Sequence, residues 1–267
     1  RNAVTRQWFS VGLAGRPEPD WVALESPGEV KLLDVQRHRR KLRRGVHRAN
    51  RFRLVLRQLE GERAVLQSRL QVLRDAGVPN YFGEQRFGIQ GSTFSAARRW
   101  MERGGRRISR QKRGLYLSAL RAALFNDLLA DRVRRGDWNR VGDGDVCMLR
   151  GSRSLFCCET VDADIAERVL AGDLHPALPL WGDGEFLAGP SVHARERALL
   201  ADDPAADFLV GRGLNLAYRA ARVVADDFCW NFCDDGSLQI ELTLPAGSYA
   251  TAVLKELVRY RQERIGE

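Results

Sequence analysis

The segment at residues 77–88 reads GVPNYFGEQRFG and holds three aromatic residues, three glycines, an Asn, a Gln and an Arg. Glycine permits positive φ and close approach of the backbone, and aromatic rings supply packing anchors or stacking faces for bases. The same composition is typical of a well-packed turn between two domains, so both interpretations stay open for most of these residues. Arg86, beside the aromatic residues, is the strongest functional candidate in the segment.

Helix and strand patterns precede this segment directly. Apolar and polar residues alternate over residues 52–57, which predicts a strand. Leucines then recur at helical spacing over residues 62–76, and Gly77 and Pro79 stand where a helix stop is expected. A strand joined to a helix by so short a loop predicts a small α/β layer.

The rest of the chain divides into a mainly helical middle and strand-rich ends. Asp162 is expected to cap a short helix, and the Pro- and Gly-rich residues 176–190 predict an irregular loop. The other predicted elements are strands at 4–11 and 238–244, helices at 93–103, 115–135, 165–170 and 248–262, and a hairpin over 145–158. This layout predicts the α+β class.

Patterns of common catalytic and metal sites are absent from the sequence. There is no Walker loop, no G-x-G-x-x-G after a strand, no G-x-S-x-G and no H-E-x-x-H. The five cysteines leave a zinc site open, but their odd number and spacing favour buried, reduced thiols. We therefore expect neither a metal nor a cofactor.

The net charge of +9 is distributed unevenly. Residues 36–58 contain ten basic residues and no acid, and residues 98–113 contain eight basic residues against Glu102 alone. Like charges at this density repel one another unless a polyanion neutralises them. A solvated surface would explain either stretch alone, whereas the two together favour nucleic acid. Arginine predominates over lysine in both, which suits forked contacts to phosphate.

The sequence shows no signal peptide and no apolar run near the roughly 18 residues of a membrane helix. We therefore expect a cytoplasmic protein without a membrane partner, and no obligate protein partner is evident. The chain opens on Arg1 rather than Met, so we expect further residues upstream.

Four motifs, in order along the chain, closely resemble the TruD family of pseudouridine synthases. They are RHRRKLRRG at 37–45, NRF at 50–52, GVPNYFGEQRFG at 77–88 and LPAGSYAT at 244–251. The opening RNAVTRQWF is also similar to the residues that follow the family's catalytic Gly-x-Lys-Asp motif. The resemblance therefore places the catalytic aspartate immediately before Arg1, so that no catalytic residue is expected within this chain.

The resemblance implies a pseudouridine-synthase catalytic core built on antiparallel sheet, with part of its N-terminal region missing, and an inserted, helix-rich domain. Residues 1–75 and 224–267 are expected to form the core, and residues 76–223 the insertion. The activity implied is isomerisation of uridine 13 in tRNA to pseudouridine, through an aspartate nucleophile and without a cofactor. Attack on the sugar and attack on the base both fit this pattern.

The resemblance also implies contacts with the substrate. Asn50 matches the Asn that faces the nucleophile, Phe52 matches the ring that stacks on the target uracil, and Tyr249 matches the aromatic residue that bounds the base pocket. Phe52 and Tyr249 would equally suit plain core positions. The expected tRNA contacts are Arg39, Arg40, Lys41, Arg43, Arg44 and Arg86. The alternative function is a structured-RNA-binding module without catalysis.

Overall fold

The computed structural model describes residues 3–43 and 45–260. They fall into two units, one holding the described residues up to Arg48 and the other spanning Ala49–Tyr260, and each is described by itself. In the first unit, regular structure among the described residues is limited to the short helix η1 (Val22–Leu24) and a bridge between Ser26 and Val30.

The predicted strand at residues 4–11 is wrong. These residues have no regular secondary structure, and large apolar side chains such as Trp8 and Phe9 are exposed by 60% and 76%. β-branched and aromatic residues favour a strand only when a neighbouring strand supplies hydrogen bonds. Among the described residues, none pairs with this segment as a strand.

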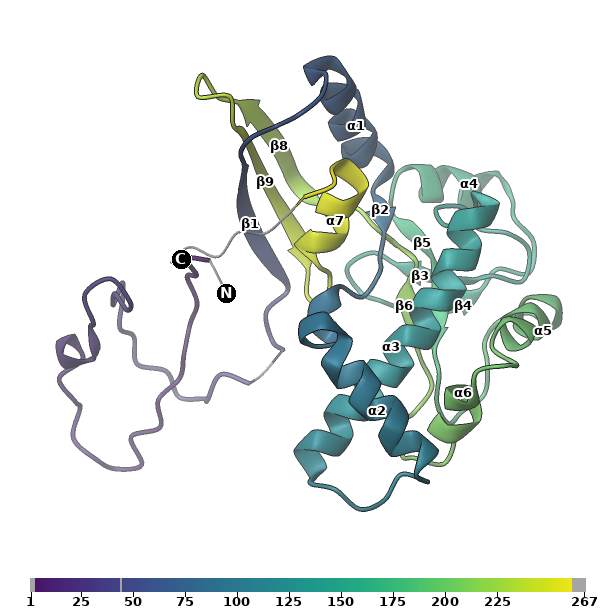
Figure 1. Ribbon diagram of the computed structural model, residues 1–267, viewed down its shortest axis with the longest axis horizontal. Helices are drawn as coiled ribbons and strands as arrows, with labels where there is room; N and C mark the ends of the chain where they lie inside the picture. Colours follow the sequence, from purple (N-terminus) through teal and green to yellow (C-terminus); the bar gives the residue numbers. More distant parts are fainter. Residues whose placement is uncertain (1–2, 44, 261–267) are drawn as a thin grey trace. The chain divides into compact units, whose positions relative to one another are not determined.

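An antiparallel three-stranded sheet, ordered β1-β9-β8, organises the ends of the second unit (Figure 1). β1 (Ala49–Leu56) pairs with β9 (Leu238–Pro245), and β9 pairs with β8 (Asp226–Phe232). α1 (Arg63–Ala76) and α7 (Ala250–Leu257) cover one face of the sheet. Their apolar side chains share one core with the alternate residues of β9, so both ends of the second unit build this layer.

The predicted end of α1 is confirmed, whereas the predicted bounds of α7 are too wide. α1 ends as expected, because Gly77 takes a φ of 75° and donates its N–H to the carbonyl of Leu73. α7 is shorter than the predicted helix at 248–262. It begins after Tyr249, which has extended backbone angles, and it ends where Val258 returns to the extended region. Residues 261 and 262 of that prediction lie outside the described residues.

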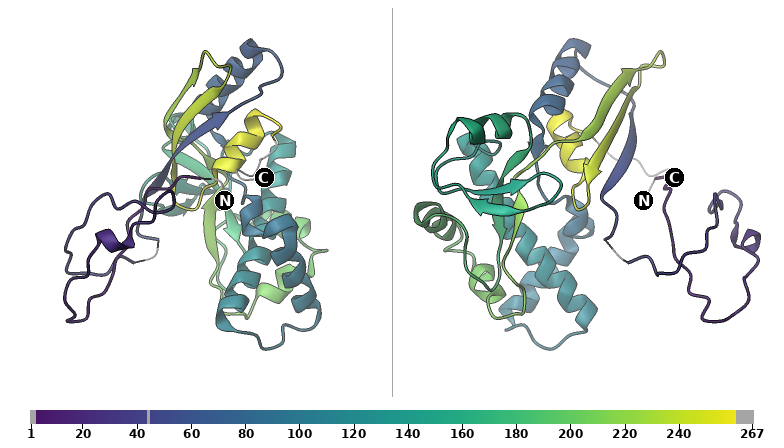
Figure 2. Two further views of the ribbon diagram at one scale, coloured as in Figure 1. Left: turned by 60° about the vertical axis from the view of Figure 1, so that its left-hand side comes forward. Right: turned by 180° about the vertical axis from the view of Figure 1, so that it is seen from behind.

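Two long helices form the middle of the unit. α2 (Ser92–Glu102) packs beside α3 (Arg110–Arg135), as both views of Figure 2 show. Their core includes the fully buried Phe125 of α3. α3 begins five residues before the predicted start at 115, because the Ser109 side chain accepts a hydrogen bond from the Lys112 N–H and caps a polar first turn.

A second antiparallel sheet has the order β4-β3-β5-β6. The predicted hairpin at 145–158 is confirmed as β3 (Val146–Leu149) and β4 (Leu155–Cys157). The short helix predicted behind it is also confirmed as α4 (Ala163–Leu170), and the side chain of Asp162 caps it by accepting a hydrogen bond from the Ile165 N–H.

The irregular loop predicted at residues 176–190 is wrong over its first part, which lies within β5 (Leu174–Leu180) between β3 and β6 (Ala217–Ala220). Pro176 and Pro179 are tolerated because each pairs with only one of the two neighbouring strands. Pro176 pairs with β3 and lies one residue outside the pairing with β6, which starts at Ala177. Pro179 pairs with β6 and lies two residues outside the pairing with β3, which ends at Ala177. Proline cannot donate to a ladder, so these positions lose little.

Short elements complete the unit. α5 (Pro190–Leu199) and α6 (Pro204–Leu209) flank the helical core, and η2 (Glu84–Arg86) and η3 (Ile89–Gly91) follow the 77–88 segment. β2 (Val78–Pro79) pairs with β7 (Arg222–Val223), where the chain leaves and re-enters the first sheet layer. No helix among residues 3–43 and 45–260 is long and apolar enough to cross a membrane. Antiparallel sheets with packed helices place the chain in the predicted α+β class.

Candidate substrate site at the meeting of two motif turns

The first strand carries two of the predicted substrate contacts. In the β1–β9 ladder Asn50 lies opposite Leu244 and Phe52 lies opposite Leu242. Alternation along the strand puts Asn50 and Phe52 on the same face. Phe52 is half-buried against the sheet core, whereas Asn50 is exposed at the end of the ladder, one residue from the pair between Ala49 and Pro245.

The turn that follows β9 carries Tyr249, and this side chain contacts the 77–88 segment directly. The Tyr249 hydroxyl accepts a hydrogen bond from Nε of Arg86 at 3.2 Å, and its ring meets that of Phe82 edge-on with centroids 6.2 Å apart. Arg86 also donates from Nη1 to the Ser118 hydroxyl on α3 at 3.0 Å. The structure thus brings Arg86 and Tyr249 together.

Gly83 lets these two turns approach each other. A Cβ placed on Gly83 would lie 2.8 Å from Oγ1 of Thr251 and 3.0 Å from Cδ1 of Tyr249. Such distances are too short for a side chain, so the glycine is required for close approach rather than for an unusual backbone angle. The sequence indicated glycines suited to close contact, and the structure identifies Tyr249 as a contacted residue.

Arg219 on β6 forms hydrogen bonds with both turns, the 77–88 segment and the turn that follows β9. Nothing in the sequence pattern predicted this role. Its guanidinium donates to the carbonyl oxygen of Asn80 at 3.1 Å, to Oδ1 of Asn80 at 2.6 Å and to the carbonyl oxygen of Gly247 at 2.9 Å. It also lies 4.2 Å from the centroid of the Phe82 ring, a cation–π contact. Desolvation lowers the pKa of Arg219 to about 10, which leaves it charged at neutral pH.

Cationic groups surround the turn that carries Tyr249. Besides Arg86 and Arg219, Arg153 donates from Nη2 to the carbonyl oxygen of Ala246 at 3.3 Å. None of these three arginines forms an ion pair with a carboxylate within residues 3–43 and 45–260. Arg219 is occupied by the carbonyl oxygens of the two turns, whereas the charges of Arg86 and Arg153, which no carboxylate of the described residues neutralises, favour an anionic ligand such as the backbone of an RNA.

The basic candidates near residue 40 belong to the first unit. Arg39, Arg40, Lys41 and Arg43 are all exposed, and none forms an ion pair with another described residue. Arg37, just before them, is bound instead to Glu18 at 2.6 Å. Arg44 lies outside the described residues, as does Arg1, next to which the catalytic aspartate is expected.

Comparison with known proteins identifies the family. The family model described as tRNA pseudouridine synthase D (TruD) matches residues 1–103 and 96–257. The chain is 46% identical over 263 residues to tRNA pseudouridine synthase D of Methylococcus capsulatus, which is 97% of this chain and 73% of that protein. The chain belongs to the TruD family. The corresponding protein of Nitrosococcus oceani is 42% identical to this TruD chain over 269 residues, covering 100% of this chain and 75% of that protein.

A solved structure supports the fold of the TruD chain. The crystal structure of the putative tRNA pseudouridine synthase D from Methanosarcina mazei matches with a TM-score of 0.58 and 18% sequence identity. The match covers 86% of this chain and 74% of that one. At this identity the likeness shows the fold alone, and it agrees with the predicted α+β class.

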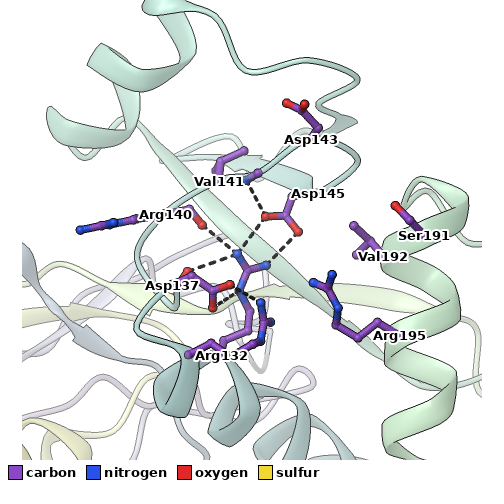
Figure 3. Close-up of a pocket in the computed structure, with 11 residues that line it drawn as sticks. Arg132, Asp137, Arg140, Val141, Asp143, Asp145, Ser191, Val192 and Arg195 are labelled. Atoms are coloured by element: carbon purple, nitrogen blue, oxygen red, sulfur yellow. Dashed lines mark hydrogen bonds and ion pairs between the residues drawn. The ribbon is translucent and has the colours of Figure 1, made fainter.

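A cavity in the described TruD chain lies away from the predicted substrate contacts. A hollow of about 290 Å³ is bordered by the end of α3, the loop after it and α5 (Figure 3). Its wall contains a buried ion pair, in which Arg132 donates to the two carboxylate oxygens of Asp145 at 2.9 and 2.8 Å. Arg132 also donates to the carbonyl oxygens of Asp137 and Arg140 at 3.2 and 2.8 Å. This network fixes the loop to α3.

Glu196 of α5 lies beside this ion pair, and its stability contribution should depend on pH. Burial, helped by the charge of Asp145 and opposed by Arg132 and Arg195, raises the pKa of Glu196 to about 8. A group whose pKa is raised in the folded state contributes stability that is fully present below its pKa in the unfolded state. This contribution is lost as the pH rises through the pKa of the folded state. Urea unfolding should therefore show the free energy of unfolding of Glu196→Gln rising relative to that of the parent by about 2–4 kcal/mol as the pH is raised from 5 to 8. A pH-independent difference would contradict this assignment.

The cysteines are partly as predicted. All five are free thiols; Cys147 and Cys158 are buried, but Cys229 is exposed on the outer face of β8. Burial raises the pKa of Cys147 to about 12, so this thiol is unreactive at neutral pH. Across residues 3–43 and 45–260, no three His, Cys, Asp or Glu side chains gather in a way that could hold a metal ion.

Proposed function

We propose that this chain is the larger part of an enzyme that converts uridine 13 of tRNA to pseudouridine. The observation that carries the proposal is the contact between two family motifs that are far apart in sequence: Arg86 of the first holds Tyr249 of the second. Membership of the TruD family supplies the reaction type, because its members are isomerases that modify tRNA uridine. The cytoplasm is the proposed site of action.

The proposed catalytic group is an aspartate directly upstream of Arg1 in the whole protein. The similarity of the opening RNAVTRQWF to the residues after the family's Gly-x-Lys-Asp supports this position. The matched relatives are longer than this chain, which leaves residues of theirs outside the match. In the reaction the bond between N1 of uracil and C1′ of ribose breaks, the uracil turns within the pocket, and its C5 forms the new bond to C1′. C5 then loses its hydrogen as a proton, and N1 takes up a proton.

The proposed roles of the substrate contacts follow from their surroundings. Asn50, exposed at the end of β1, would hydrogen-bond the aspartate and a polar edge of the uridine. Phe52, on the same strand face, would stack on the flipped base and offset the stacking lost in the RNA. Tyr249 would bound the pocket from the opposite turn, fixed there by Arg86.

Phosphate contacts and the domain division complete the proposal. Arg39, Arg40, Lys41, Arg43 and Arg44 are proposed to bind the tRNA backbone, together with Arg86. Residues 76–223 are proposed as the inserted domain, since one core cluster contains residues from Ala97 to Ala221 while another joins Leu70–Val78 to Val223–Leu257. The two clusters are consistent with an insertion that begins and ends at the β2–β7 pair.

The decisive experiment locates the modified nucleotide. Full-length protein, including the residues upstream of Arg1, should be incubated with unmodified tRNA transcript, and pseudouridine should be mapped by carbodiimide-dependent primer-extension stops. We expect a stop that reports position 13 with the parent protein and no stop after the proposed upstream aspartate is replaced by alanine. Binding without any stop would instead favour the non-catalytic RNA-binding module.

A further inference from the structure

The end of α2, the turn after it and the first turn of α3 carry a dense group of exposed basic side chains. We call this group the arginine tip. It lies where the two helices end, at the lower edge of Figure 1. Its members, all exposed, are Arg99, Arg103, Arg106, Arg107, Arg110, Lys112 and Arg113.

The positive charges of the arginine tip are not neutralised within the described chain. Arg98, just before the tip, is bound to Asp203 by two hydrogen bonds of 2.7 and 2.6 Å. By contrast, none of the tip residues forms an ion pair with a described residue, and neither does Glu102, the one acid in this segment. Arg212 adds a further cation beside the tip, stacked on Phe208 at 4.1 Å and close to Gly105.

The arginine tip also occupies an unfavourable place on α3. The N-terminal end of a helix carries partial positive charge, so cations there destabilise the folded protein and anions stabilise it. The first turn of α3 contains Arg110, Lys112 and Arg113 and no acidic residue. A turn of this composition costs stability in the free protein, and a bound polyanion would reverse that cost by satisfying the side chains and the helix end together.

Helix α3 connects the arginine tip with the proposed uridine pocket. Ser118, which fixes Arg86 beside Tyr249, lies on α3 eight residues after Arg110. Eight helical residues span about 12 Å, so the tip can reach phosphates of an RNA whose target base lies at Tyr249. Arginine rather than lysine dominates the tip, which suits forked contacts to phosphate.

We propose that the arginine tip is a second phosphate-binding surface for the tRNA whose uridine enters the Asn50–Tyr249 site. This inference rests on the proposed function, because the tRNA is taken to be the same molecule. The tip would set the affinity and orientation of the RNA and leave the chemical step unchanged. Its contribution to binding would be electrostatic and would decrease as salt increases.

The test compares two triple variants of the full-length protein with equal loss of charge. The first is Arg103→Gln with Arg107→Gln and Arg110→Gln, in the tip. The matched control is Arg140→Gln with Arg195→Gln and Arg197→Gln, three exposed arginines without ion pairs to described residues, on α5 and the loop after α3. Affinity for fluorescently labelled tRNA is measured by anisotropy across a series of KCl concentrations. Single-turnover pseudouridine formation is measured at saturating protein.

We expect the tip variant to bind tRNA about tenfold or more weakly near physiological salt, and the dependence of log affinity on log salt to fall by roughly two. Its single-turnover rate at saturation should match the parent, and its Tm should be unchanged or higher by roughly 1–3 °C. The control should bind within about threefold of the parent with the same salt dependence.

Three outcomes would overturn the inference: equal losses in the tip and control variants, no loss in the tip variant, or a lower Tm that explains the loss. Failure of the proposed function is distinguishable from these. In that case the parent itself forms no pseudouridine, while its affinity for tRNA still reports on the tip.

Discussion

Replacing Asn50 by alanine in the full-length protein is expected to lower the single-turnover rate of pseudouridine formation by about 10² to 10³-fold. The amide is exposed and forms no hydrogen bond with another described residue, so its loss should hardly change the free energy of unfolding. In the proposed role, the substitution removes the amide that hydrogen-bonds the upstream aspartate and the uridine. Affinity for tRNA should stay within about threefold, because phosphate contacts dominate binding.

Asn231 supplies a matched control for Asn50. It is also an exposed asparagine in the same sheet, but it lies on β8 opposite Gln239, toward the end of β9 remote from Leu244. Asn231→Ala should leave both rate and affinity at the parent values. Equal losses of rate and affinity in Asn50→Ala would show that Asn50 only positions RNA, and would contradict the proposed role.

Replacing Arg219 by methionine is expected to impair both stability and turnover. The substitution removes the donors to the Asn80 side chain and to the carbonyl oxygens of Asn80 and Gly247. Unpaired, partly buried acceptors of this kind should lower the free energy of unfolding by about 2–4 kcal/mol in urea titrations. Because the Gly247 contact fixes the turn that carries Tyr249, we also expect turnover to fall by about tenfold or more with little change in tRNA affinity.

Replacing Arg121 by methionine is a control that distinguishes loss of stability from loss of turnover. This half-buried arginine on α3 also donates to two main-chain carbonyls, those of Leu180 and Asn215, at 2.6 and 2.5 Å, but it contacts neither motif turn. Arg121→Met should therefore lose stability to a similar degree and retain the parent turnover when measured well below its Tm. Similar loss of turnover in both variants would mean that Arg219 acts through stability alone. Arg219→Lys, which restores the charge but not the fork, should recover part of the turnover.

Local patterns predicted much of the fold correctly. The strand at 52–57 and the Asp162 cap were predictable because each depends on near neighbours in sequence. The failures depend on distant partners. β5 was missed because its prolines suggested a loop. They are compatible with the strand only because each lies outside the pairing with one of the two neighbouring strands. The segment at 4–11 has strand composition, and composition cannot supply a hydrogen-bonded neighbour.

The candidate site shows the same limit. Arg86 and Tyr249 could each be selected from motifs, but their mutual hydrogen bond could not, since it joins residues brought together only by the complete fold. Arg219 gave no signal at all, because a single arginine in a short strand resembles any surface arginine. Its importance comes from the Asn80 and Gly247 carbonyls that converge on it.

The hydrogen bond between Arg86 and Tyr249 spans 163 positions of the chain, and this has a consequence for biogenesis. Contacts of such long range form late, because the intervening chain must first lose its conformational freedom. During synthesis, β1 and the 77–88 segment leave the ribosome well before the turn that carries Tyr249. The nascent protein can therefore expose basic residues before the proposed uridine pocket is complete, and the turn that carries Tyr249 is the later of the two parts to be made.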